Sequence, residues 1–206
     1  MIGRIAIALS LLVFAAGVLA ASIFRTITPQ YAFSQTARPG AVLSLEKEPV
    51  EYYLPYPGIL PDHFLWPLKA ARDQIWLFLT TDSLKKGEIY LLFADKRLGA
   101  AKALLEGGKT ELAIPTLTKA EMYLESAAEE ERKARGEGKD TGSLPETLAL
   151  ASLKHREILE ELYIKAPDEA RPIIAEALNS PKNIYDNLKS DLRSLGKPIP
   201  PSPFEP

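Results

Sequence analysis

The stretch that decides the fold is residues 83–134, which read SLKKGEIYLLFADKRLGAAKALLEGGKTELAIPTLTKAEMYLESAAEEERKA. Leucines recur in it every seven residues, and a small residue stands three positions after each of them. The pairs are Leu84/Gly87, Leu91/Ala94, Leu98/Ala101, Leu105/Gly108, Leu117/Ala120 and Leu124/Ala127. Because this spacing keeps both residue types on one side of a helix, the stretch predicts two helices, at about 83–106 and 110–134.

The two helices are expected to form an antiparallel hairpin. Gly107-Gly108 ends the first helix, since glycine enters the left-handed conformation without strain. Its partner follows after a tight turn, so the two seams should face each other. Large residues are then expected to interlock and small ones to set a short separation, at Leu91, Leu98, Leu117, Leu124, Ala94, Ala101, Ala120 and Ala127. We expect Pro115 in a distorted first turn, because an interior proline costs about 3 kcal/mol.

Helical patterns extend outward from the hairpin on both sides. Before it, Asp62 is expected to cap a helix reaching Leu79, with Leu68, Ala71, Ile75 and Leu79 as its apolar stripe. After it, the charge run 129–135 reads as a solvated face. The fold class predicted is therefore all-α: an antiparallel helical bundle of four to five helices over residues 62–195.

The C-terminal part of this bundle has its own signals. Ser143 and Glu146 resemble a capping box that opens a helix to about Ala166. One face of that helix carries Leu148, Ala151, His155, Ile158 and Leu162. Apolar residues then keep the same helical spacing from Ile174 past Pro181. This spacing predicts either one kinked helix or two stacked helices. Residues 196–206 form a proline-rich tail that cannot fold by itself.

The N-terminal 24 residues indicate where the chain works. Ile5 to Phe24 is an uncharged and largely apolar run, about long enough to cross roughly 30 Å of hydrocarbon. Arg4 before it predicts a cytoplasmic N-terminus and an external remainder. Residues 1–24 are thus a signal peptide or transmembrane anchor. Val18-Leu19-Ala20 suits cleavage and the length of the run favours retention, so we expect a single-pass membrane protein or one secreted after cleavage.

Six prolines break residues 25–61, which should form a proline-rich spacer and an extended strip. The part from Val50 to Leu60 is too apolar for a free linker, and we interpret it as a strip lying on the folded domain. The alternative is a juxtamembrane linker that makes no defined contact.

Composition narrows the classes of function. The chain is 46% hydrophobic and 25% charged, which suits a globular domain with a core. A net charge of −2 gives no indication of nucleic-acid binding. Because cysteine is absent, disulfides, thiolate metal sites and cysteine nucleophiles are excluded.

No catalytic signature emerges from the motifs. The chain lacks a nucleophile elbow, a phosphate loop and the H-E-x-x-H pattern, and neither histidine has a glutamate three residues before it. His155 on an apolar face is expected to be a half-buried, hydrogen-bonded side chain, and His63 to shape the start of the first helix. We therefore predict no enzyme, and no catalytic, cofactor-binding or metal-binding residues.

One set of residues suggests a ligand site. Trp66, Trp76 and Phe78 lie on the first helix of the bundle and form a candidate ligand groove. The simpler interpretation of the same cluster is core packing. A helical bundle that binds a ligand or peptide outside the cytoplasm is the alternative function that this groove would support.

Several segments resemble a known family. They are Leu54 to Asp62 (LPYPGILPD), Leu65 to Lys69 (LWPLK), Lys85 to Leu91 (KKGEIYL), Ala94 to Leu98 (ADKRL) and Leu112 to Glu121 (LAIPTLTKAE). Together they look like a bacterial domain family of unknown function found in membrane-tethered or secreted proteins, over roughly residues 52–165. The resemblance implies a helical domain outside the cytoplasm and brings no activity or site residues. A likeness to tetratricopeptide-type helix pairs is confined to the hairpin, because no 34-residue period follows.

These observations favour a non-enzymatic, membrane-tethered helical interaction module outside the cytoplasm. Its partners are expected to be the membrane, through the N-terminal helix, and a protein of the cell envelope. No cofactor is expected.

Overall fold

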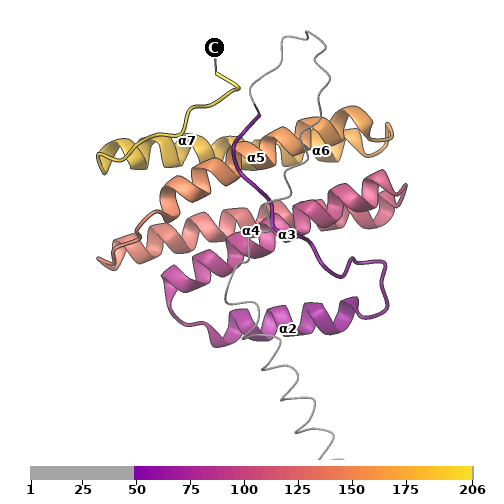
Figure 1. The fold of residues 1–206 in the computed structure, drawn as a ribbon, viewed down its shortest axis with the longest axis horizontal. Coiled ribbons are helices and arrows are strands. Elements are labelled where there is room, and N and C mark those ends of the chain that lie inside the picture. Colours follow the sequence, from indigo (N-terminus) through magenta and orange to yellow (C-terminus); the bar gives the residue numbers. More distant parts are fainter. Residues whose placement is uncertain (1–48, 206) are drawn as a thin grey trace, which may run out of the picture.

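The computed structural model describes residues 49–205 (Figure 1). Its helices are α2 (Trp66–Leu79), α3 (Ser83–Glu106), α4 (Thr110–Gly136), α5 (Leu144–Lys165), α6 (Arg171–Ala177) and α7 (Asn179–Ser194). No strand occurs in these residues, which confirms the all-α prediction. Only Leu178 separates α6 from α7, so together they correspond to one interrupted helix. The expected membrane helix and most of the proline-rich spacer lie outside the described residues.

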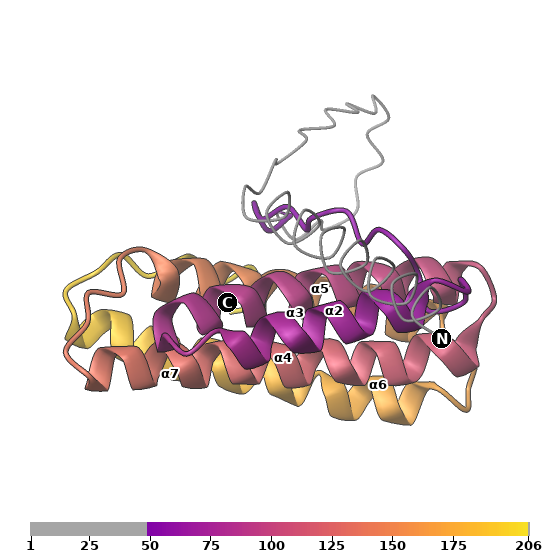
Figure 2. The same ribbon diagram turned by 90° about the horizontal axis from the view of Figure 1, so that it is seen from below.

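The helices run side by side and build an elongated bundle (Figure 2). Figure 1 shows α2 at one edge, the α3–α4 hairpin beside it, and α5 with α6 and α7 on the other side. In the described part of the chain, none of the helices has the length and hydropathy needed to cross a bilayer.

The α3–α4 hairpin forms as predicted. Helix α3 has the expected bounds, and Gly108 beyond it has a φ of +73°. The N–H of Lys109 donates to the carbonyl of Leu104 at 2.8 Å, which closes the turn of the chain. The seam pairs in antiparallel register: Leu91/Ala94 share one buried cluster with Leu124/Ala127, and Leu98/Ala101 share a second with Leu117/Ala120.

Small residues bring the two helices close together. A Cβ added at Gly87 would lie 3.3 Å from the carbonyl oxygen of Ala127, which is tighter than ordinary contact. Ala94, Ala101, Ala120 and Ala127 are fully buried. A larger side chain in this seam therefore has no space unless the helices separate.

Pro115 departs from expectation, because it lies inside α4 at the sixth residue instead of in a distorted first turn. Its missing N–H would have paired with the carbonyl of Glu111. Since Glu111 is exposed, water can satisfy that carbonyl, and the helix continues.

Local side chains shape the starts of α2 and α3. Asp82 caps α3 by accepting the N–H of Lys85 at 3.0 Å. The expected cap at Asp62 is wrong: α2 begins at Trp66, and the Asp62 carboxylate instead pairs with Lys109 in the turn between α3 and α4. His63 shapes the turn before α2, as expected, because its Nδ1 accepts the N–H of Leu65.

The capping box at Ser143 is wrong as well, although α5 begins where it predicts. The Ser143 side chain makes no capping hydrogen bond. Glu146 pairs with Lys197, beyond the end of α7, instead of folding back on the helix start. A long-range ion pair thus takes the place of the local capping hydrogen bonds. The predicted apolar face of α5 is buried along its whole length.

The charge run 129–135 is only partly a solvated face. Glu131 is almost completely buried, and its Oε1 lies 3.6 Å from Arg135 Nε. Arg135 in turn pairs with Asp191 of α7. The interpretation failed at Glu131 because α7 covers this part of α4, and the local charge pattern gives no sign of a distant helix.

The strip at residues 50–57 crosses the bundle near the middle of α5, and the C-terminal tail folds back along α7 (Figure 1). The N–H of Val50 donates to Glu157 Oε2 at 2.8 Å, and the ring of Pro57 lies 3.7 Å from where a Cβ on Gly99 would stand. Residues 50–57 thus lie on the domain. In the tail, the Tyr185 hydroxyl donates to the carbonyl of Pro200, and Arg156 covers the ring of Phe204 at 4.1 Å.

The apolar stripe predicted for the first helix is present, but it faces solvent instead of the bundle. Leu68, Ala71, Ile75 and Leu79 are exposed, whereas Asp73 and Leu77 on the opposite side are buried. Helix α2 is held to the bundle by its more polar side, through contacts such as Gln74 Nε2 to the Tyr123 hydroxyl at 2.9 Å.

Candidate functional site

A buried cluster of charged side chains lies at the centre of the bundle. Helix α5 supplies His155, α3 supplies Asp95 and α4 supplies Glu121. Each carboxylate directly follows a small seam residue, Ala94 or Ala120. That position aims both carboxylates past the edge of the hairpin seam toward α5.

The imidazole of His155 bridges the two carboxylates. Its Nδ1 lies 2.8 Å from Glu121 Oε1, and its Nε2 lies 3.2 Å from Asp95 Oδ1. All three side chains are buried, with His155 wholly inaccessible to solvent. Buried charges are stable only when paired and hydrogen bonded, and the bridge supplies both conditions.

The carboxylates keep the imidazole charged. Burial alone would lower the pKa of His155, but the charge of Glu121 and the hydrogen bonds to Asp95 and Glu121 outweigh it and raise the pKa to about 9. At neutral pH the ring is therefore an imidazolium that donates from both nitrogens.

The proline-rich strip closes the cluster from outside. The Tyr52 hydroxyl donates to Asp95 Oδ2 at 2.6 Å, so the carboxylate is held by the strip on one oxygen and by His155 on the other. Two residues earlier, Val50 is fixed to α5 through Glu157. The cluster therefore joins α3, α4, α5 and the strip at one point.

This arrangement suits a structural role better than a catalytic one. A general acid or base must come within hydrogen-bonding distance of a substrate, and no solvent-exposed face of His155 is available for that. Glu121 Oε2 is buried without a hydrogen-bonding partner among the described residues. Residues 49–205 hold no group of three side chains placed to bind a metal ion.

The three aromatic residues of the candidate groove do not line one space. Trp76 packs edge-on against Phe93 of α3, with ring centroids 5.8 Å apart. Trp66 lies under the guanidinium of Arg97, also from α3, at 5.3 Å. Phe78 instead points away from the bundle. In the described residues, one surface hollow lies between α4 and α7 and another lies between α5 and α7.

The comparison with known families decides what the chain is. Residues 58–169, more than half of the sequence, match the family described as a domain of unknown function, DUF5667. The chain belongs to this family. No curated protein and no solved structure matches the chain. The resemblance noted in the sequence is thereby confirmed as membership of a family without an assigned function.

The DUF5667 match covers α2 to α5 and includes Asp95, Glu121 and His155. Tyr52, which closes the cluster, precedes the matched range, and α6, α7 and the tail follow it. The family domain thus supplies the three charged side chains, and Tyr52 from the preceding strip closes the cluster.

Sequence reasoning identified His155 as a hydrogen-bonded side chain but missed its partners. It also expected half-burial, whereas the ring is fully buried. A signal for the partners was present: Asp95 and Glu121 are charged residues directly beside seam alanines, where a third helix must pack. Nothing local to Tyr52 indicates that its hydroxyl reaches Asp95.

Proposed function

We propose that this chain is a non-enzymatic, membrane-tethered helical interaction module that works outside the cytoplasm. The observation that carries the proposal is the outward-facing apolar side of α2. Soluble domains bury such stripes, and an exposed contiguous one marks an interaction surface. The stripe faces outward because the opposite side of α2 is already occupied by α3 and α4.

The tether is supported by the sequence. Ile5 to Phe24 has the length and apolarity of a membrane-spanning helix, and Arg4 favours an external domain. Chain from that segment enters the domain at Val50, where main-chain and side-chain hydrogen bonds fix it to α5 and α3. Tension on the membrane segment would therefore act on the hydrogen bonds that join the strip to α5 and α3.

A non-enzymatic role is supported by the burial of the charged cluster, because the His155 ring is bonded on both nitrogens and has no solvent-exposed face. The alternative function, a bundle that binds a ligand or peptide, requires the rings of Trp66, Trp76 and Phe78 to gather around one space. Two of them pack against α3 and the third faces outward, so the interaction module is favoured.

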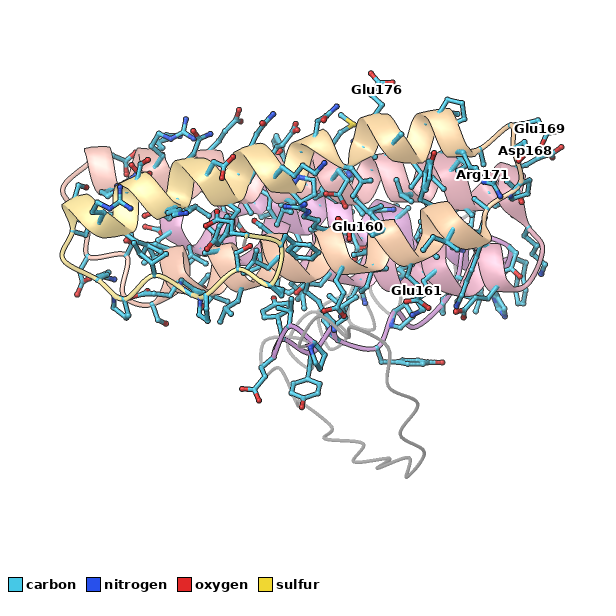
Figure 3. All side chains as sticks on the ribbon, turned by 90° about the horizontal axis from the view of Figure 1, so that it is seen from above. Glu160, Glu161, Asp168, Glu169, Arg171 and Glu176 are labelled. Carbon is cyan, nitrogen blue, oxygen red and sulfur yellow. The ribbon has the colours of Figure 1, made fainter. Side chains whose placement is uncertain are left out.

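Location can be tested by cysteine labelling, since the native chain contains no cysteine. Glu176→Cys places a single thiol on α6, where the side chain projects away from the bundle (Figure 3). We expect a membrane-impermeant maleimide to label this variant in intact spheroplasts, and labelled protein to stay with the membranes after an alkaline wash.

The matched control is Ser152→Cys, at a fully buried position of α5, which should stay unlabelled while the domain is folded. Labelling of Glu176→Cys only after lysis would place the domain in the cytoplasm. Release of the labelled protein by the alkaline wash would rule out the tether.

A further inference from the structure

The strip at residues 50–57 lies on the outside of the bundle and belongs to no helix or sheet (Figure 2). Its side chains alternate in direction. Val50 and Tyr52 pack against one cluster of the core, whereas Glu51 and Tyr53 are exposed. Within the strip only Val50 is buried. The strip therefore contributes one buried side chain to the core and covers the rest from outside.

Separate side-chain contacts attach the strip to the helices. The N–H of Val50 donates to Glu157 Oε2 of α5 at 2.8 Å, and the Tyr52 hydroxyl donates to Asp95 Oδ2 of α3 at 2.6 Å. Each such bond stabilises the attachment modestly, because it replaces a hydrogen bond to water. No ladder of main-chain hydrogen bonds joins the strip to the rest of the described chain. Segments held in this way open more easily than packed helices.

The helices are joined to one another without the strip. His155 of α5 bridges Asp95 of α3 and Glu121 of α4, and this bridge does not involve Tyr52. If the strip leaves, Asp95 Oδ2 can accept hydrogen bonds from water instead. The family match gives the same division, because it begins at residue 58, directly after the strip. We therefore expect the bundle to stay folded when the strip separates from it.

A further attachment begins where the strip ends. Lys69 of α2 donates to the carbonyls of Pro57 and Ile59, at 2.7 and 3.0 Å. Helix α2 is itself packed on α3 through Trp76. This attachment therefore holds as long as α2 is packed, and a separation that starts at Val50 should stop at Pro57.

We propose that the strip detaches reversibly from the folded bundle and thereby lengthens the link between the membrane and the domain. Its eight residues add roughly 25–30 Å to that link when fully extended. Tension from the N-terminal side reaches the Val50 contact first and the Tyr52 contact next, so the bonds break one after another. Detachment is a property of the fold alone, and its use in lengthening the link rests on the proposed tether.

Single cysteines in the full chain test the detachment. Val50→Cys places a thiol on the buried inner side of the strip, and Ser152→Cys places one inside α5. Each variant is reacted with a maleimide at urea concentrations below the unfolding transition. We expect position 50 to react about a hundredfold faster than position 152. Its rate should hardly change with urea, because detachment exposes little surface, whereas the rate at position 152 should rise steeply.

Tyr52→Phe, combined with Val50→Cys, tests the contact that holds the strip. Without the hydroxyl that donates to Asp95, the thiol at position 50 should react about tenfold faster or more. Tyr56→Phe, at an exposed position of the strip, is the matched control and should leave the rate unchanged. The same rate in both double variants would overturn the proposal.

Equal rates with equal urea dependence at positions 50 and 152 would also overturn it, because strip and bundle would then open as one unit. So would a reaction at position 50 as fast as at the exposed Glu176→Cys, because the strip would then not be docked. The purified chain in detergent serves for these measurements, whichever side of the cell membrane holds the domain. A failure here therefore leaves the location test standing, and the reverse also holds.

Discussion

At the scale of single residues, the folded state depends on a charge that is buried but fully paired. His155 is positive at neutral pH because Glu121 and Asp95 hold it so, and the three side chains come from three different helices. Removing the imidazole would leave two carboxylates facing each other without their cation. Such broken buried pairs typically cost about 3–5 kcal/mol.

The raised pKa of His155 predicts a pH dependence of stability. Its ordinary pKa is 6.5 and its value in the folded protein is about 9. A raised pKa contributes stability that is complete below pH 6.5 and is lost as the pH rises through about 9. The shift corresponds to roughly 3 kcal/mol. Urea unfolding at pH 6 and at pH 9.5 should show this loss.

The control for that measurement is His155→Gln, which removes the titrating group. Its stability should be lower at pH 6 and should change much less between the two pH values. Equal pH dependence in the two proteins would show that His155 is not the group responsible.

Tyr52→Phe tests the contact between strip and cluster. The substitution removes only the hydroxyl that donates to Asp95 Oδ2 at 2.6 Å. Because a buried carboxylate oxygen then loses a partner, we expect a cost of about 1–3 kcal/mol in thermal or urea unfolding. Tyr56→Phe, at an exposed position of the same strip, is the matched control and should be nearly neutral. Similar small effects from both would mean that the strip does not secure the cluster.

At the scale of elements, the α3–α4 hairpin was predictable because its information is local. The glycine turn and the two seams lie within one stretch of sequence, and the seam residues meet in the expected register. The caps at Asp62 and Ser143 failed for the opposite reason. The carboxylates of Asp62 and Glu146 instead form ion pairs with residues far along the chain, Lys109 and Lys197.

Two substitutions test the seam. Ala101→Leu inserts bulk at a fully buried position between α3 and α4, so we expect overpacking to cost about 1–3 kcal/mol. Leu98→Ala, in the same layer, should cost about 2–5 kcal/mol by opening a cavity. Denaturant melts report both. The exposed Ala103→Leu is the control and should stay within about half a kcal/mol. Unchanged midpoints for the two seam variants would place the seam on the surface.

At the scale of the whole molecule, the sequence indicates which faces are apolar but not which face of a helix meets the bundle. The stripe of α2 was correctly recognised and assigned to the wrong side. The inward side is anchored by Trp66, Trp76 and Gln74 through residues of α3 and α4, and these contacts exist only once the hairpin has formed. The charged cluster could not be predicted from the sequence either, because its three members lie on three helices that meet only in the folded bundle.

The proposed interaction surface exists only if α2 turns its apolar side outward. Leu77 and Phe78 are adjacent in sequence, but Leu77 is buried and Phe78 is exposed. Denaturant melts of Leu77→Ala and Phe78→Ala therefore test the claim most directly. We predict a loss of about 2–5 kcal/mol for Leu77→Ala and a change within about half a kcal/mol for Phe78→Ala. A large loss for Phe78→Ala with little effect of Leu77→Ala would show that α2 packs its apolar stripe against the bundle, and would contradict the account.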